Sequence, residues 1–76
     1  MSIRKQVLNT LSSRSLSTAS EVLYTVNMER RANGDRPTSL GTVSSILNKE
    51  KKTGRVLAMQ GFGIRGGMGY VRGRVI

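Results

Sequence analysis

The most informative stretch of this chain is residues 38–56, which read TSLGTVSSILNKEKKTGRV. Thr38 or Ser39 can cap a helix. Apolar residues then recur at helical spacing, at Leu40, Val43, Ile46 and Leu47. Lysines gather in the last turns, where cations suit the helix dipole, and Gly54 is a natural stop. The pattern predicts a helix over residues 40–52.

Two further helices are predicted ahead of this one. The first spans 3–12, with Ser2 as its N-cap and an apolar face made by Ile3, Val7, Leu8 and Leu11. The second spans 19–31 and opens with a capping box, Thr18 with Glu21. Between them, Leu16 is predicted to bridge to the sheet. Turn residues fill 32–37, ahead of the third helix.

The C-terminal part of the chain predicts a β-hairpin. Residues 55–60 and 70–76 read as strands around a glycine-rich loop, 61–69, and Gly73 weakens the second strand. We therefore expect an α+β fold: one domain over 1–76, with three helices followed by a hairpin over 55–76. The predicted core comprises Val7, Leu8, Leu11, Val22, Leu23, Val26, Val43 and Leu47.

This order of elements resembles the winged helix-turn-helix family of DNA-binding domains. Residues 38–56 are similar to its recognition helix: a small polar cap, a Thr-Val pair, an Ile-Leu pair, a basic turn, a glycine and a strand. The resemblance covers the chain as an architecture, and only these residues carry its specific part. It implies that the third helix enters the major groove and that the hairpin loop is the wing. The loop before this helix exceeds the 3–4-residue turn of the compact motif, which leaves the interhelical angle open.

Composition points to a polyanionic partner. Thirteen lysines and arginines oppose four acids, a net charge of +9, and the last 26 residues hold six cations and no acid. Without histidine or cysteine, the chain lacks the commonest general base and metal ligands, so we expect no enzyme, no metal site and no cofactor. No apolar run approaches the ~20 residues of a membrane span, and the start does not resemble a signal peptide. A cytoplasmic protein is expected, with no membrane partner.

The predicted DNA-binding residues lie on the outer face of the third helix and on the hairpin. Opposite its apolar stripe, the helix presents serine, threonine and asparagine, which can read base edges, and lysines, which neutralise phosphates. The hairpin adds arginines that can reach phosphates or a narrow minor groove. The full set is Thr42, Ser45, Asn48, Lys49, Lys52, Arg55, Arg65, Arg72 and Arg74. The expected function is a small DNA-binding protein, a transcriptional regulator or an architectural protein, bound to double-stranded DNA.

Several alternatives remain open from the sequence. The helix face and the hairpin can be ordinary solvated surface. The Arg/Gly-rich tail can bind RNA, with Tyr24, Phe62 and Tyr70 as the available stacking surfaces. A winged helix can also dock onto an acidic partner protein. Tyr24 and Met28, four residues apart and opposite the core face of their helix, either pack against the first helix or the hairpin, or form a self-association patch for a homodimer.

Overall fold

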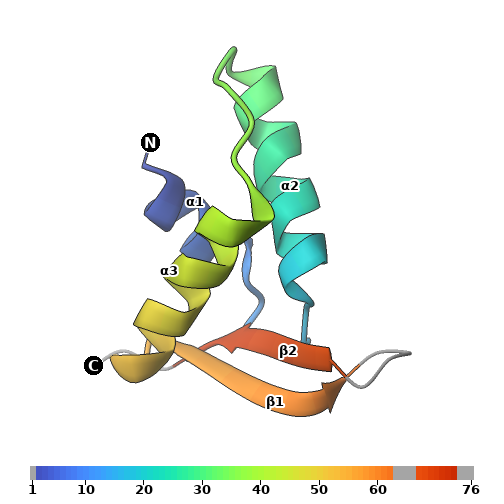
Figure 1. The fold of residues 1–76 in the computed structure, drawn as a ribbon, viewed down its shortest axis with the longest axis vertical. Coiled ribbons are helices and arrows are strands. Elements are labelled where there is room, and N and C mark those ends of the chain that lie inside the picture. Colours follow the sequence, from blue (N-terminus) through green and yellow to red (C-terminus); the bar gives the residue numbers. More distant parts are fainter. Residues whose placement is uncertain (1, 63–66, 74–76) are drawn as a thin grey trace.

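The fold is α+β, with three helices followed by a two-stranded antiparallel hairpin (Figure 1). The computed structural model describes residues 2–62 and 67–73. Its elements are α1 (Ile3–Thr10), α2 (Ala19–Ala32), α3 (Leu40–Lys52), β1 (Val56–Phe62) and β2 (Gly67–Arg72). The helices stand on one face of the hairpin, and the α2–α3 connection lies at the end farthest from the sheet. The predicted fold class is confirmed.

All three predicted helix starts are confirmed by their caps. The Ser2 hydroxyl accepts from the Lys5 N–H at 3.2 Å. The capping box of α2 is complete, because Thr18 and Glu21 satisfy each other's backbone N–H groups. At α3 the cap is Ser39, the second of the two predicted candidates.

Helix ends are set by glycine in two cases and by the sheet in the third. Gly34 and Gly54 have φ of 77° and 83°, and each follows a helix whose last carbonyls accept from the turning chain. α1 was predicted to reach residue 12 but ends at Thr10, because Leu11 is extended. The next carbonyl, of Ser12, accepts from the Arg72 N–H at 2.8 Å, so pairing beside the sheet replaces the last helical turn.

The hairpin extends further toward its loop than the sequence indicated. β1 continues through Gly61, whose φ of 87° accompanies a bulge, and β2 begins at Gly67 rather than at residue 70. β1 starts one residue later than predicted, since the Arg55 N–H donates to the last turn of α3. The bridge to the sheet is made by Ser17 rather than by Leu16, through paired backbone hydrogen bonds with Tyr70 of 2.8 and 2.9 Å.

The core lies between the helices and the inner face of the hairpin. Its buried members are Val7, Leu11, Val22, Val26, Val43, Leu47, Val56 and Tyr70. The predicted core residues Leu8 and Leu23 are half-buried at its edge. Leu40, predicted on the apolar stripe of α3, is the first residue of that helix and is 45% exposed.

Candidate nucleic-acid interface

The outward face of α3 is polar along its whole length. Thr42, Ser45, Asn48, Lys49 and Lys52 are all exposed. Val43 and Leu47, on the opposite side of the helix, have no exposed surface. The predicted orientation of α3 is therefore confirmed, and its burial pattern brings five of the predicted DNA-binding residues onto one free surface.

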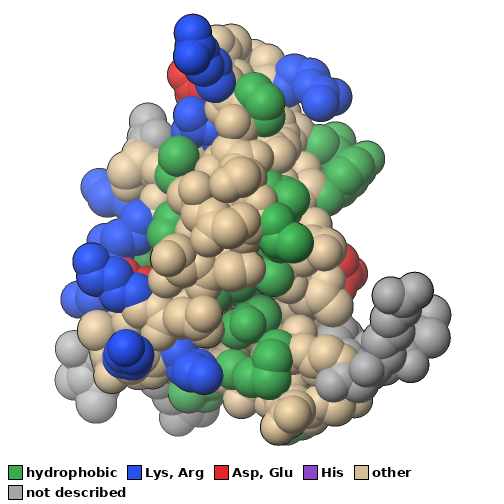
Figure 2. Space-filling view, in the orientation of Figure 1, with side chains coloured by type: hydrophobic (Ala, Val, Ile, Leu, Met, Phe, Trp, Pro, Cys, Tyr) green, Lys and Arg blue, Asp and Glu red, His purple; other side chains and the backbone are tan. Residues whose placement is uncertain are grey.

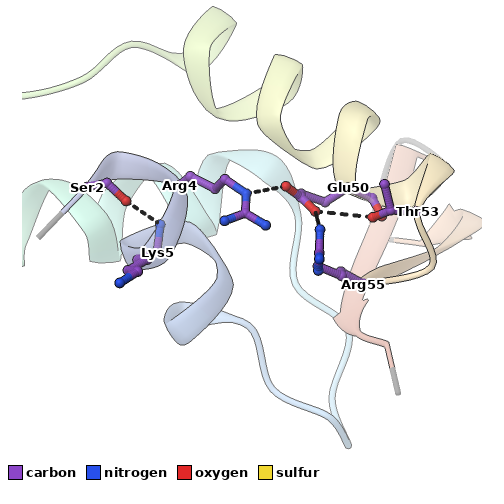
Figure 3. A network of polar contacts seen from close by, with 6 residues as sticks. All are labelled: Ser2, Arg4, Lys5, Glu50, Thr53 and Arg55. Atoms are coloured by element: carbon purple, nitrogen blue, oxygen red, sulfur yellow. Dashed lines mark hydrogen bonds and ion pairs between the residues drawn. The ribbon is translucent and has the colours of Figure 1, made fainter. Parts of the chain in front are cut away.

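Glu50, the one acid of α3, does not belong to that surface. Its side chain is only 4% exposed and lies between the start of α1 and the turn after α3 (Figure 3). Arg4 donates to one carboxylate oxygen, Oε1. Arg55 and Thr53 donate to the other, Oε2, at 3.3 and 3.2 Å. The negative charge is thus surrounded by donors inside the fold.

The same contacts keep Glu50 ionised. The hydrogen bond from Arg4 is the main cause that lowers the pKa of Glu50 from 4.5 to about 2, against burial, which raises it. Hydrogen bonds from Arg55 and Thr53 lower it further. In return, the hydrogen bond to Glu50 raises the pKa of Arg4. The pairing joins α1 to α3 and leaves one positive charge in excess.

A cluster of cations surrounds this pairing. In Figure 2, Lys and Arg side chains gather on the left of the molecule, over α1 and the C-terminal half of α3. We call it the basic cluster and define it as the cations of α1 and of the C-terminal half of α3, together with Arg55, which pairs with Glu50: Arg4, Lys5, Lys49, Lys51, Lys52 and Arg55. The cluster holds six cations, and the one acid of these elements, Glu50, is buried, so the surface is strongly positive.

Sequence reasoning missed the contribution of α1 to this cluster. Arg4 and Lys5 were not among the predicted DNA-binding residues. A signal was present, because both cations occupy the first turn of α1, where they oppose the helix dipole. A cation that opposes the dipole of its own helix destabilises that helix, so it is a candidate for an interaction with another part of the protein or with a partner.

The position of α3 is fixed by side chains of α2, despite the long connection between the two helices. The Asn27 amide donates to the Thr38 carbonyl at 3.1 Å and accepts from the Thr38 N–H at 2.8 Å. Arg30 donates to the Arg36 carbonyl at 2.6 Å and to the buried side chain of Gln6 at 3.0 Å. These hydrogen bonds hold the segment immediately before the cap of α3 against α2, in addition to the packing of the two helices in the core.

The predicted arginines of the hairpin have different environments. Arg72 is exposed, and its guanidinium donates to the carbonyls of Leu8 and Asn9 at 3.1 and 3.0 Å, which ties β2 to the end of α1. Two of its five N–H groups are used in this way. Arg65 and Arg74 lie outside the described residues.

The aromatic residues considered for stacking are not equally available. Tyr70 is a core residue, only 7% exposed, so it offers no surface to a base. Tyr24 is 68% exposed and Met28 is 53% exposed, which excludes the interpretation that they pack against α1 or the hairpin. Of these two tyrosines, only Tyr24 offers a surface for stacking.

Comparison with protein-family models, curated proteins and solved structures finds no significant match to this chain. Over residues 2–62 and 67–73, no helix is long and apolar enough to cross a membrane. The same residues contain no group of three acidic, histidine or cysteine side chains that can hold a metal ion. The features of the described residues that indicate a function are therefore the exposed face of α3 and the basic cluster beside it.

Proposed function

We propose that this chain is a winged-helix protein that binds duplex DNA, with α3 in the major groove. The observation that carries the proposal is the outward face of α3: small polar residues followed by lysines, with the only acid of the helix turned inward. An acid among these lysines would repel phosphates and cancel part of their attraction. With Glu50 held by Arg4 and Arg55, the face presents cations and neutral hydrogen-bonding groups alone.

The dimensions of α3 suit this mode of binding. An α-helix with its side chains is about 10–12 Å across, and the major groove of B-DNA is about 12 Å wide. Thr42, Ser45 and Asn48 lie where a helix in the groove meets base edges, and an asparagine amide is matched to adenine. The lysines that follow, at the C-terminal end, are placed for the flanking phosphates.

The basic cluster supplies a second, sequence-independent contact. Arg4 of α1 reaches Glu50 at the lysine-rich end of α3, so a phosphate backbone crossing this end meets cations from two elements (Figure 3). The wing is proposed to grip a neighbouring stretch of DNA through Arg65, Arg72 and Arg74. A small protein of this kind serves as a transcriptional regulator or an architectural protein.

Fluorescence anisotropy with a labelled duplex tests the proposal. Affinity should fall steeply between low and physiological salt, with a log–log slope that corresponds to roughly 4–8 phosphate contacts. Lys52→Ala should weaken binding to every sequence and reduce the slope by about one. Arg31→Ala is the matched control, because Arg31 is an equally exposed cation on α2, away from α3, and should change binding little.

Base reading is tested separately from charge. Asn48→Ala should cost ~1–3 kcal/mol on the best site selected from a random library, and little on random DNA. Absence of binding at low salt, or binding that does not depend on salt, would contradict the proposal. That outcome would favour docking onto an acidic protein.

A further inference from the structure

The outer surface of α2 carries a row of side chains in which Leu23 and Asn27 also contact the rest of the fold and the other members are exposed. Tyr24 and Met28 are its largest members, 68% and 53% exposed. They line a shallow groove of about 430 Å³ whose residues recur at steps of three and four along the helix: Ser20, Leu23, Tyr24, Asn27, Met28 and Arg31. This spacing is that of the seam along which two helices pack against each other. We call this row the α2 seam.

Charge limits what can occupy the α2 seam. Residues 19–35 hold three of the four acids, Glu21, Glu29 and Asp35, and two arginines, a net charge of −1. The rest of the chain then carries +10, with eleven cations and one acid, the buried Glu50. In Figure 2, most of the basic side chains lie on the left of the molecule, and a hydrophobic patch lies at the upper right, over α2, with a basic side chain above it and an acidic one below it. α2 itself is neutral, with Glu21 and Glu29 against Arg30 and Arg31, so two copies of this basic chain repel each other less through α2 than through its basic parts.

The sequence of the α2 seam is complementary to itself when two copies run antiparallel. With the two-fold axis at the level of residue 26, Tyr24 of each copy lies opposite Met28 of the other, a favourable contact between an aromatic ring and a thioether. At the ends, Glu21 of each copy lies at the level of Arg31 of the other. A parallel pair would instead place Arg31 against Arg31. We propose that the chain forms an antiparallel homodimer through the α2 seam.

The size of the surface indicates a weak dimer. A helix of 14 residues is about 21 Å long and presents a strip roughly 10 Å wide. Such a strip buries less than the ~1,200 Å² at which stable specific complexes begin. The dimer should therefore form at high micromolar concentration, and more readily when repulsion between the basic parts is screened by salt. This inference does not depend on the proposed function, because the α2 seam lies away from the outward face of α3.

Sedimentation equilibrium from about 20 μM to about 1 mM, in roughly 0.3 M salt, measures the association directly. Tyr24→Ser should weaken it about tenfold or more, since an aromatic side chain is lost twice per dimer. The matched control is Leu57→Ser, which removes an apolar residue 54% exposed on the outer face of the hairpin. That face is bordered by Arg14 and Arg72, whose charges would repel a second copy, so the control should dimerise like the parent chain.

Three further variants test the charges and the orientation. Glu21→Gln keeps the capping box but removes the carboxylate charge, and should weaken the dimer without loss of helix.

The orientation is tested by disulfide formation. Because the chain has no cysteine, Tyr24→Cys and Met28→Cys each introduce a single thiol. When equal amounts of the two variants are combined and oxidised, an antiparallel pair should give well over the roughly twofold excess of mixed disulfide over each homodisulfide that random pairing gives.

The proposal is overturned by a monomer at 1 mM, by a Tyr24→Ser variant that associates like the parent chain, or by a Leu57→Ser variant that loses association. An excess of homodisulfides would overturn the antiparallel arrangement. Circular dichroism of each variant shows whether its helices are intact, so that loss of the dimer is distinguished from loss of the fold.

Discussion

Replacement of Gly73 by alanine should loosen the contact between the end of β2 and the turn after α3. A Cβ at this position would lie 2.1 Å from the Gly54 carbonyl oxygen and 3.1 Å from the Arg55 carbonyl carbon. Ordinary contact begins at 3.4 Å, so the new methyl must move by about 1.3 Å, and its neighbours are backbone atoms that have no rotamer to change. The move also strains the hydrogen bond of 2.8 Å from the Gly73 N–H to the Arg55 carbonyl.

The expected cost follows from these two effects. Overpacking of a filled site costs ~1–3 kcal/mol and the loss of one hydrogen bond ~0.5–1.5 kcal/mol, which together give about 2–4 kcal/mol. For a domain of this size, that corresponds to a fall in Tm on the order of 10–30 °C. Thermal unfolding followed by circular dichroism measures it, with urea unfolding as a second measurement of the free energy.

Gly41→Ala is the matched control, because the same methyl group is added in open space. Gly41 lies on the exposed side of α3, and its nearest neighbour would be the Ser39 Oγ at 3.9 Å. Alanine there should stabilise the protein by roughly 0.5–1 kcal/mol, since it restricts the unfolded chain. A Gly73→Ala variant whose Tm falls by less than about 3 °C, while Gly41→Ala behaves as expected, would refute the close approach of β2 to the α3 turn.

Three other outcomes are expected. Because the pKa of Glu50 is held at about 2, below its ordinary 4.5, its contribution to stability is complete above about pH 4.5 and is lost as the pH falls toward 2. Glu50→Gln, which cannot ionise, should therefore flatten the dependence of unfolding free energy on pH in this window; an unchanged curve would show that the pairing with Arg4 adds nothing. Asn27→Ala removes both side-chain hydrogen bonds to Thr38 and should cost ~1–3 kcal/mol in urea unfolding. Its affinity for DNA should fall as well, and full affinity would mean that α3 keeps its position without them. Leu47→Ala empties a fully buried core position and should cost ~2–5 kcal/mol, which can unfold so small a domain; a loss below 1 kcal/mol would contradict the core described above.

The sequence alone was sufficient for the order of the helices and strands and for the helix caps, but not for all of their bounds. A cap is a local interaction, formed between residues two to four apart, so Ser2, the Thr18–Glu21 box and Gly54 could be identified without any knowledge of the fold. The outward orientation of α3 followed for the same reason, because helical periodicity assigns one face to the core.

The tertiary structure decided which charges are free. From the sequence alone, Glu50 is one more surface acid in a lysine-rich turn. In the structure it is buried and paired, and its main partner, Arg4, comes from 46 residues away. From the sequence alone, Asn27 is a polar surface residue of α2. In the structure, it forms two hydrogen bonds with the backbone of Thr38, which lies beside it. From the sequence alone, Gly73 is a residue that weakens its strand. In the structure, the backbone of Gly54 and Arg55 packs against it. Each of these contacts joins residues distant along the chain, and local propensity carries no information about such partners.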